Sequence, residues 1–291
     1  MPVLIAYLLV VLIWGTTPLA IHWSNGAGSV MAAVCLRMLI ALALALMINA
    51  VIGKSLFDRP GVWKAYLAAA IGIFPNMPLV YWSAQFIPSG LMAVVFAFSP
   101  FVTGLLCWLM LGDNPFNRRR LLALVVALAG LGLVFAGQLR AVPGSAPGVL
   151  GMLLSCGLFS FSSVWLKRLD MQVDAFNQTA GALMFALPGL LLLWWFTGGH
   201  WQLDSASLAA IVYLAIGGSL LGFTLFFYVL ARLPPTVVSL ITLVTPVVAI
   251  VLGALLAQER PAVQVLVGAG LVLLALVAYL EVFSKPLGDQ S

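Results

Sequence analysis

Apolar runs of about 20 residues follow one another along nearly the whole chain of 291 residues. Each run is long enough to cross the hydrocarbon core of a bilayer as a helix. In lipid every backbone N–H and C=O group needs a partner within the protein, and a helix supplies these partners internally. The composition agrees, because 64% of the residues are hydrophobic and only 7% are charged. We therefore predict an all-α integral membrane protein.

Polar residues, glycines and prolines divide the chain into ten such runs, which we predict as ten transmembrane helices. Their approximate bounds are residues 3–23, 29–52, 62–86, 88–111, 118–137, 147–167, 174–197, 206–231, 235–257 and 261–281. The first run has almost no basic residue before it and no small-residue cleavage site after it. We interpret it as the first transmembrane helix rather than as a cleavable signal peptide.

The 13 lysines and arginines predict the orientation of the helices, because cytoplasmic loops carry an excess of these residues. If the N-terminus is cytoplasmic, ten of them lie on the inner side: Lys54, Arg59, Lys64, Arg118, Arg119, Arg120, Lys167, Arg168, Arg232 and Lys285. Only Arg140 and Arg260 fall on the outer side, and Arg37 falls within the membrane. We therefore expect a multi-pass protein of a bacterial-type cytoplasmic (inner) membrane, with both termini in the cytoplasm. The net charge of +5 then reflects the inner loops, and no nucleic-acid partner is expected.

Two stretches of the chain repeat one pattern. "SPFVTGLLCWLMLGDNP" (Ser99–Pro115) is similar to "TPVVAIVLGALLAQERP" (Thr245–Pro261), with two prolines and an acid in equivalent places. We predict two copies of one unit, residues 1–143 with the first five helices and residues 144–291 with the last five. Because five is odd, the second copy enters the membrane from the opposite side. This inverted repeat is a construction of many secondary transporters, whose substrate site lies near the membrane midplane between the halves.

The acids of the repeat, Asp113 and Glu259, each lie two residues before a proline that opens the next helix. A carboxylate in this place can cap free N–H groups and interact with the positive end of the helix dipole. The two acids lie at opposite membrane faces, so they cannot act as a catalytic or proton-relay pair. We therefore interpret them as structural caps.

Taken together, these features resemble the EamA-type members of the drug/metabolite transporter superfamily. The resemblance covers nearly the whole chain and rests on "LIWGTTPLA", "LRMLIALALAL", "YWSAQFIPSGLMAVVFAFSPFVTGLLCWLMLGD" and "TPVVAIVLGALLAQE". One departure is Asp113, where the family more often has glutamate. The resemblance implies export or exchange of small metabolites by alternating access. It leaves the substrate open among amino acids, sugars, nucleotide precursors, amines and drugs.

Interrupted helices in matching positions indicate where a substrate could bind. Broken backbone inside a bilayer is tolerated where it is buried in protein or lines a wet cavity. The predicted breaks and bends involve prolines, which remove backbone donors, and glycines. They are Gly15, Pro75, Pro78, Pro100, Gly217, Gly218, Gly222 and Pro246. Asn76, between two of these prolines, could bond either a substrate or the freed carbonyl groups, and the sequence favours neither.

Aromatic and hydroxyl side chains near these breaks are the candidate lining of a central cavity. They are Trp14, Thr17, Phe74, Tyr81, Trp82, Phe98, Phe223 and Tyr228. Trp14 is the strongest candidate, because it lies in the middle of the first helix and away from both membrane interfaces. For each of the other aromatic residues, contact with lipid or with a neighbouring helix is the commoner role.

Arg37 is the one basic residue predicted inside the membrane. A charge near the bilayer centre costs about 2.5–3.5 kcal/mol on insertion scales. No acid is predicted at its depth, so its partners are expected to be carbonyl groups, water or an anionic part of the substrate. Three roles remain open: a structural anchor, a source of positive potential in the cavity, or a direct contact with a substrate carboxylate.

The sequence contains little that would support another class of function. Cys35, Cys107 and Cys156 lie in apolar runs without metal-ligand spacing, and no P-loop is present, so we expect no metal, no cofactor and no enzymatic activity. We expect a secondary transporter, monomeric or homodimeric, that exports amino acids or related amphipathic solutes. The alternative is an exporter of organic cations or drugs, since aromatic faces attract cations. Against it, no acid is predicted within the membrane to balance a cation.

Overall fold

The computed structural model describes most of the chain. The described residues are 1–25, 29–112, 118–141, 144–198, 200, 204–239, 241–242, 245, 255–256, 258 and 262–281. Among the residues given a structural role above, Asp113, Pro246 and Glu259 lie outside them, so their predicted roles as caps and as a helix bend remain predictions. Arg260 and Lys285 also lie outside them.

Helices make up the regular structure of the described residues, as an all-α membrane protein requires. The first half contains α1 (Val3–Ser24), α2 (Val30–Val51), α3 (Trp63–Ala70), α4 (Asn76–Ser83), α5 (Ser89–Phe96), α6 (Ser99–Leu111) and α7 (Arg118–Ala141). The second half contains α8 (Ala146–Leu169), α9 (Ala175–Phe196), α10 (Ser205–Tyr213), η1 (Leu214–Leu221), α11 (Gly222–Arg232), α12 (Pro235–Val238) and α14 (Val263–Glu281).

Six stretches among the described residues are long and apolar enough to cross a membrane. They are Val3–Ser24, Val30–Val51, Ser89–Leu111, Ala146–Leu169, Ala175–Phe196 and Ser205–Arg232. The helical membrane class is therefore confirmed, while the count of ten crossings remains a prediction.

Side-chain caps explain where several of these helices begin. Ser29 accepts a hydrogen bond from the N–H of Ala32 before α2, and Asp174 accepts two from the first turn of α9. Asp204 accepts from the N–H and the hydroxyl of Ser207 at the start of α10. These hydrogen bonds hold the pKa of the Asp204 carboxyl below its usual value. Each cap satisfies backbone donors that the first helical turn leaves without a partner.

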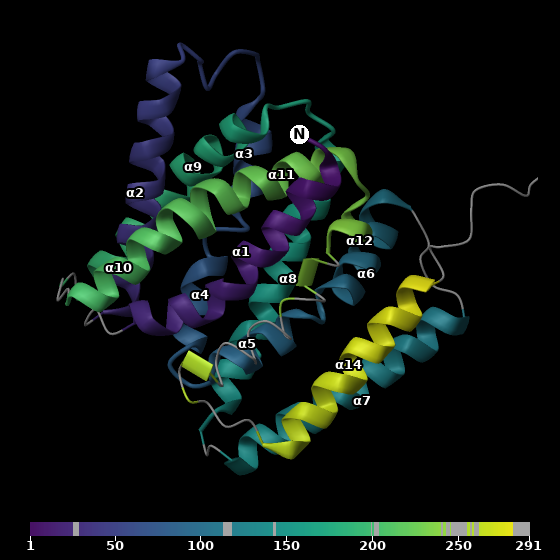
Figure 1. Ribbon diagram of the computed structural model, residues 1–291. Coiled ribbons are helices and arrows are strands. Elements are labelled where there is room, and N and C mark those ends of the chain that lie inside the picture. The colour runs from purple at the N-terminus through teal and green to yellow at the C-terminus, as the bar shows by residue number, and fades with distance from the viewer. Residues whose placement is uncertain are drawn as a thin grey trace, which may run out of the picture.

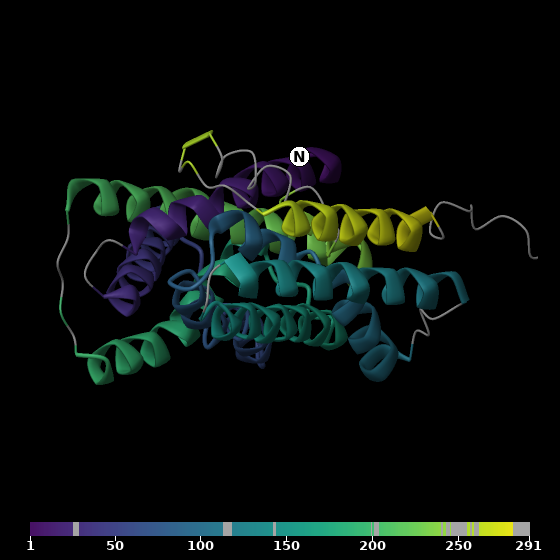
Figure 2. The same ribbon diagram turned by 90° about the horizontal axis from the view of Figure 1, so that it is seen from below.

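The two halves of the chain interlock rather than forming separate bodies (Figure 1). From the first half, α1 packs on α10 and α11, α2 on α9 and η1, and α3 and α4 on α9 and α8 respectively. At one edge, α7 and α14 lie side by side, as both ribbon views show (Figures 1 and 2). The core is thus built from helices of both predicted repeats.

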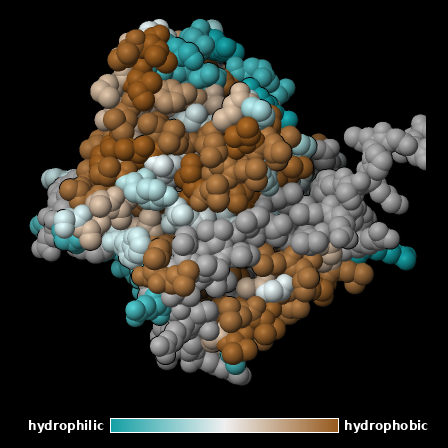
Figure 3. Space-filling model, in the orientation of Figure 1, coloured by the Kyte–Doolittle hydropathy of each residue, from teal (hydrophilic) through white to brown (hydrophobic). Residues whose placement is uncertain are grey.

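The surface is hydrophobic where a soluble protein would be polar. Figure 3 shows hydrophobic residues over the region of α2 and along α7 and α14. Large exposed apolar side chains occur on several helices, among them Leu4, Leu12, Val51, Leu109, Leu122, Leu192 and Leu274. Polar side chains are buried instead, including Arg37, Asn76 and Gln178. This reversed distribution suits a protein whose outer face contacts lipid.

The predicted helix covering residues 62–86 and the one covering 206–231 both depart from regular α-geometry. The first consists of α3 and α4, separated by residues 71–75, which include a cis peptide bond between Phe74 and Pro75. The second passes through the π-helical segment η1 between α10 and α11. π-helical turns are rare and are frequently found at functional sites. The first irregular segment leads into α4, whose Met77 and Val80 line the cavity described below, and η1 contributes Gly218 to it.

Helices α3 and α9 approach closely at Gly181, so a larger residue at this position is predicted to lower the stability of the protein. A Cβ on Gly181 of α9 would overlap the ring of Tyr66 on α3, and Tyr66 is 0% exposed, so its ring has no space to move into. We expect Gly181→Ala to lower the free energy of unfolding by about 1–3 kcal/mol through overpacking. Melting of the purified protein in detergent measures this.

Gly157→Ala on α8 is the matched control, because nothing lies within 4 Å of its Cβ position. Its effect should be neutral or a stabilisation of up to about 1 kcal/mol from helix propensity. Equal melting temperatures for the two variants would contradict this account of the α3–α9 contact.

Candidate substrate cavity

A cavity lies between helices of both halves of the chain. Its empty space, including its open mouth, is about 680 Å³. Residues from α1, α2, α4, α5, α8, η1 and α11 and two threonines of the segment after α12 form its wall. They are Trp14, Thr17, Pro18, Ile21, Arg37, Met77, Val80, Met92, Ala93, Phe96, Met152, Phe159, Gly218, Phe223, Thr242 and Thr245.

Arg37 is the charged residue of this wall, and it is 1% exposed. Its Nε donates to Ser219 Oγ at 2.8 Å, and its Nη1 donates to Tyr81 Oη at 3.3 Å. Neither partner is charged, and no ion pair to Arg37 occurs among the described residues. Its Nη2 has no hydrogen-bond acceptor in the described part of the chain. The structure thus holds the guanidinium at Nε and Nη1 and leaves the donors of Nη2 available at the cavity.

The π-helical segment η1 allows this cation and an indole to approach its backbone. A Cβ on Gly218 would lie 3.0 Å from Nη2 of Arg37, and the carbonyl oxygen of Gly218 accepts a hydrogen bond from Trp14 Nε1 at 3.3 Å. A Cβ on Gly222 would lie only 2.6 Å from the same Nε1. A larger residue at Gly222 would therefore displace the indole of Trp14, and one at Gly218 would crowd the end of the Arg37 side chain.

Aromatic rings form the apolar part of the wall. The ring of Trp14 packs against Phe159, Phe223 and Phe226 with centroid distances of 5.6, 5.9 and 5.0 Å. Phe96 packs against Phe159 at 5.5 Å. These tilted and edge-on contacts fix the orientation of the rings. The result is a firm apolar surface beside one cation.

The threonine hydroxyls of the wall have already donated their hydrogens. Thr17 donates to the carbonyl of Ile13 at 3.0 Å, Thr242 to that of Ser239 at 2.7 Å, and Thr245 to that of Thr242 at 3.1 Å. A hydroxyl has one donor and two acceptor lone pairs. These groups therefore offer only acceptors to a ligand, whereas Arg37 offers only donors.

Four of the aromatic, hydroxyl and basic residues proposed from the sequence line the cavity: Trp14, Thr17, Arg37 and Phe223. Among the predicted helix breaks, Gly218 also lines it, and Gly222 lies against Trp14.

The other predicted helix breaks that the structure describes lie outside the cavity lining. Gly217 lies near the ring of Tyr213, and Gly15 is buried within α1. Pro75 is the residue before α4, Pro78 is buried in the first turn of α4, and Pro100 lies in the first turn of α6.

The other proposed residues lie outside the cavity lining. Tyr81 is buried and acts on the cavity only through Arg37. Asn76 is also buried: it donates to the carbonyl of Gly72 at 2.8 Å and accepts from the hydroxyl of Ser155 on α8. Phe74 lies against Gly189 of α9.

Three further aromatic residues are placed elsewhere. Trp82 is 36% exposed and packs edge-on against Phe86. Phe98 packs against Phe101 at 5.3 Å. The hydroxyl of Tyr228 donates to the carbonyl of Met1, at the end of the molecule that carries the N-terminus.

Eleven of the sixteen lining residues, Phe159 among them, were missed by the sequence reasoning, as was Ser219 beside the cavity. Ser219, which accepts from Nε of Arg37, directly follows the glycine pair that marked the break, and its position there was a usable signal. Phe159 on α8 lies between Trp14, Phe96 and Phe226, and nothing in its sequence neighbourhood distinguished it from other apolar residues.

A cavity between helices of both halves of the chain, bordered by interrupted helices, is typical of secondary transporters. The family model of the EamA-like transporter family matches residues 1–136 and 146–280. The chain belongs to this family of membrane transporters, which confirms the resemblance found in its motifs.

Relatives agree with this assignment, and a solved structure shares the fold of the chain. The chain is 27% identical to Protein PecM of Dickeya dadantii over 278 residues, which cover 91% of this chain and 88% of that protein. It is 28% identical to the uncharacterized inner membrane transporter YedA of Escherichia coli over 179 residues, 60% of this chain and 56% of YedA. A solved crystal structure matches with a TM-score of 0.72 at 17% identity, covering 96% of this chain and 97% of that one, which shows the fold alone.

The contact of η1 and α11 with Trp14 predicts that Gly222 and Gly217 differ in how well they tolerate substitution by alanine. We expect Gly222→Ala to displace the indole, break its bond to Gly218 and reduce transport strongly, because the new Cβ would lie 2.6 Å from Trp14 Nε1. Gly217→Ala should be nearly neutral, because its Cβ would meet only the Tyr213 ring at 3.5 Å, an ordinary van der Waals distance. Transport and melting temperature of both variants test this, and similar losses in the two would contradict it.

Proposed function

We propose that the protein is a secondary transporter that moves small amphipathic carboxylates, above all amino acids with apolar side chains, by alternating access. The observation that carries the proposal is the guanidinium of Arg37. It is buried, it has no ionised partner among the described residues, and it faces a cavity that is otherwise apolar and aromatic.

A buried cation without an anion is costly, and a ligand can supply the missing charge. Desolvation of an ion in a protein interior costs several kcal/mol unless an opposite charge or hydrogen bonds compensate. Ser219 and Tyr81 provide neutral hydrogen bonds at Nε and Nη1. A carboxylate at Nη2 would add a charge-assisted hydrogen bond, which is roughly twice as strong as a neutral one. An anionic substrate group is therefore favoured at this point of the cavity.

The remaining wall suits the rest of such a solute. Trp14, Phe159 and Phe223 offer apolar surface to a hydrocarbon or aromatic side chain. Thr17, Thr242 and Thr245 offer only acceptor lone pairs, which suits an ammonium group. A neutral amino acid combines these three elements in one small molecule.

The membrane arrangement is part of the same proposal. The two matches to the family model, residues 1–136 and 146–280, fall within the two proposed repeats, 1–143 and 144–291. Ten crossings in two inverted copies, with both termini in the cytoplasm, agree with the distribution of basic residues. YedA is named as an inner membrane transporter, which supports the same membrane for this chain.

The residues of the cavity lining also indicate how transport could be driven. Its described residues include one arginine and no aspartate or glutamate. A carboxylate that carries a proton together with the substrate is thus absent from this lining. Export by facilitated diffusion, or exchange down a metabolite gradient, is the simplest coupling consistent with it.

A second candidate function is export of organic cations or drugs, which the aromatic wall favours through cation–π attraction. The positive charge of Arg37 in the same wall opposes it. The two candidates differ in which ligands stabilise the folded protein.

We expect leucine and phenylalanine to raise the melting temperature of the purified protein and phenethylamine to leave it unchanged. A ligand present at 100 times its Kd stabilises the folded state by about 2.7 kcal/mol. Arg37→Gln should abolish this stabilisation, because it removes the charge that binds the carboxylate, while Arg37→Lys should retain part of it.

Arg232→Gln is the matched control, since Arg232 is an exposed arginine that lies over the ring of Tyr228, outside the cavity lining. It should respond to amino acids as the wild type does. Stabilisation by phenethylamine in both the wild type and Arg37→Gln, without stabilisation by amino acids, would favour the cation exporter instead. Counterflow of labelled phenylalanine in proteoliposomes then tests transport itself.

A further inference from the structure

A second cavity lies at the end of the molecule that carries the N-terminus, where α8, α9 and α11 meet. Its empty space, including its mouth, is about 420 Å³. The C-terminal end of α8, the connection to α9 and the C-terminal end of α11 form its wall. The lining residues used below are Lys167, Asp170, Gln172, Gln178 and Phe227.

This cavity contains both a cation and an anion. Lys167 Nζ donates to the carbonyls of Leu230 and Ala231, both at 3.3 Å, at the C-terminal end of α11. An ammonium group has three donors, so one remains for a ligand. Asp170 lies three residues further along and does not form an ion pair with Lys167. Opposite charges therefore border the same space without neutralising each other.

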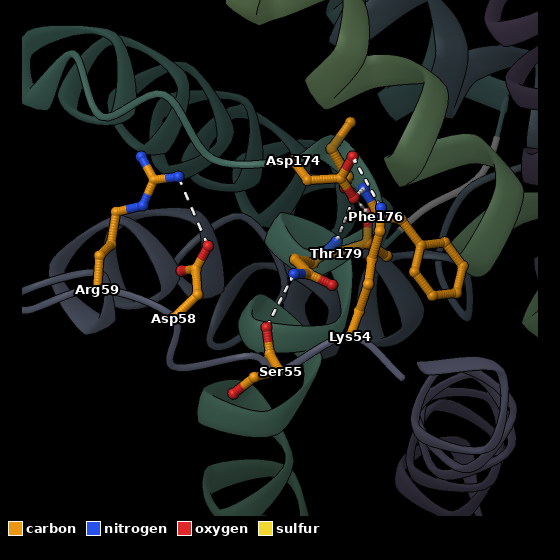
Figure 4. Close-up of polar contacts among 9 residues, drawn as sticks. Lys54, Ser55, Asp58, Arg59, Asp174, Phe176 and Thr179 are labelled. Atoms are coloured by element: carbon orange, nitrogen blue, oxygen red, sulfur yellow. Dashed lines mark hydrogen bonds and ion pairs between the residues drawn. The ribbon is translucent and has the colours of Figure 1, made fainter. Parts of the chain in front are cut away.

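The peptide that carries Asp170 is fixed in place. Asp170 ends α8 in the left-handed conformation, with φ of 46°. The following connection is bound by Arg59, whose Nη1 donates to the carbonyl of Gln172 at 3.0 Å. Lys54 forms an ion pair of 3.6 Å with Asp174, and Asn177 donates to the carbonyl of Ser55 (Figure 4). The loop between α2 and α3 thus holds this wall of the cavity.

Aromatic rings on one helix connect the two cavities. Phe223 lines the central cavity and Phe227, one turn further along α11, lines the second. Their rings are stacked with centroids 6.1 Å apart. Gln178, 3% exposed and held by its bond to Ala65, completes the polar side of the second cavity. Each cavity therefore offers a cation and an apolar ring, and the second adds a carboxylate.

We propose that the second cavity is an additional binding site for a zwitterionic amino acid, at which Lys167 binds the carboxylate and Asp170 binds the ammonium group. The assignment rests on the proposed function for the identity of the ligand. The ligand would supply an opposite charge to each of these two side chains, of which Asp170 is exposed and Lys167 is half-buried. On the route between this end of the molecule and the central cavity, it is a loading or release site, separated from Arg37 by the layer of Phe223 and Phe227.

Saturation binding of radiolabelled phenylalanine to the full chain in detergent tests the proposal. We expect two phenylalanine molecules per chain in the wild type. Asp170→Asn should weaken one of the two sites about tenfold or more, because it removes a hydrogen bond between charged groups. Asparagine tolerates the left-handed backbone at this position, so the variant should fold normally. Lys167→Gln should weaken the same site and Arg37→Gln the other.

An analogue of phenylalanine without the amino group distinguishes a direct contact of Asp170 with the ligand from a structural role of this residue. Binding of 3-phenylpropanoate, which lacks the ammonium group, should be unchanged by Asp170→Asn, while Lys167→Gln weakens it at this site. A single site per chain that depends on Arg37 and is insensitive to Asp170→Asn would overturn the second site and leave the proposed function standing. Two sites of which neither responds to Arg37→Gln would overturn the proposed function instead. No binding of phenylalanine by the wild type would overturn both.

Discussion

The hydrogen-bonded guanidinium of Arg37 is the interaction on which the cavity depends. It joins the two halves of the chain, because Arg37 on α2 donates to Ser219 on η1 and to Tyr81 on α4. A cation at this depth requires polar partners, and the partners it has are neutral, so its charge remains available in the cavity. The irregular backbone of η1 is what brings a serine hydroxyl and an open glycine face to it.

Close packing then determines where the other helices can lie. Lipid offers no hydrophobic driving force between helices, so their association depends on van der Waals contact and on polar bonds between them. α9 meets aromatic rings of the first half through Gly181 and Gly189, and α8 meets α4 through Gly151. Buried hydrogen bonds cross the same contacts, as between Ser155 and Asn76. The fold is consequently held by small residues at crossing points and by polar groups that satisfy one another.

The membrane class and the family could be predicted from the sequence because both follow from local patterns. Apolar runs of membrane length predict helices whatever their neighbours are. The proline and glycine clusters around Pro75 and Gly217 fall in segments that depart from regular α-geometry, since these residues alter the backbone wherever they occur. Trp14, Arg37 and Phe223 of the cavity lining could also be proposed from the sequence, because an arginine within an apolar run and aromatic residues beside helix breaks are unusual in their own segments.

What the sequence by itself determined is which segments are apolar and long enough to cross a membrane and where prolines and glycines cluster within them, because these depend on composition within each segment. Only the tertiary structure decided which side chains face the cavity. Trp14 and Trp82 are both aromatic and both near a break, yet Trp14 lies against Phe159 while Trp82 is 36% exposed. Asn76 bonds Gly72 and Ser155, and Phe159 enters the cavity wall without any local signal. The direction of a helix face depends on the rotation of that helix against partners more than a hundred residues away, and no pattern within a single segment carries that information.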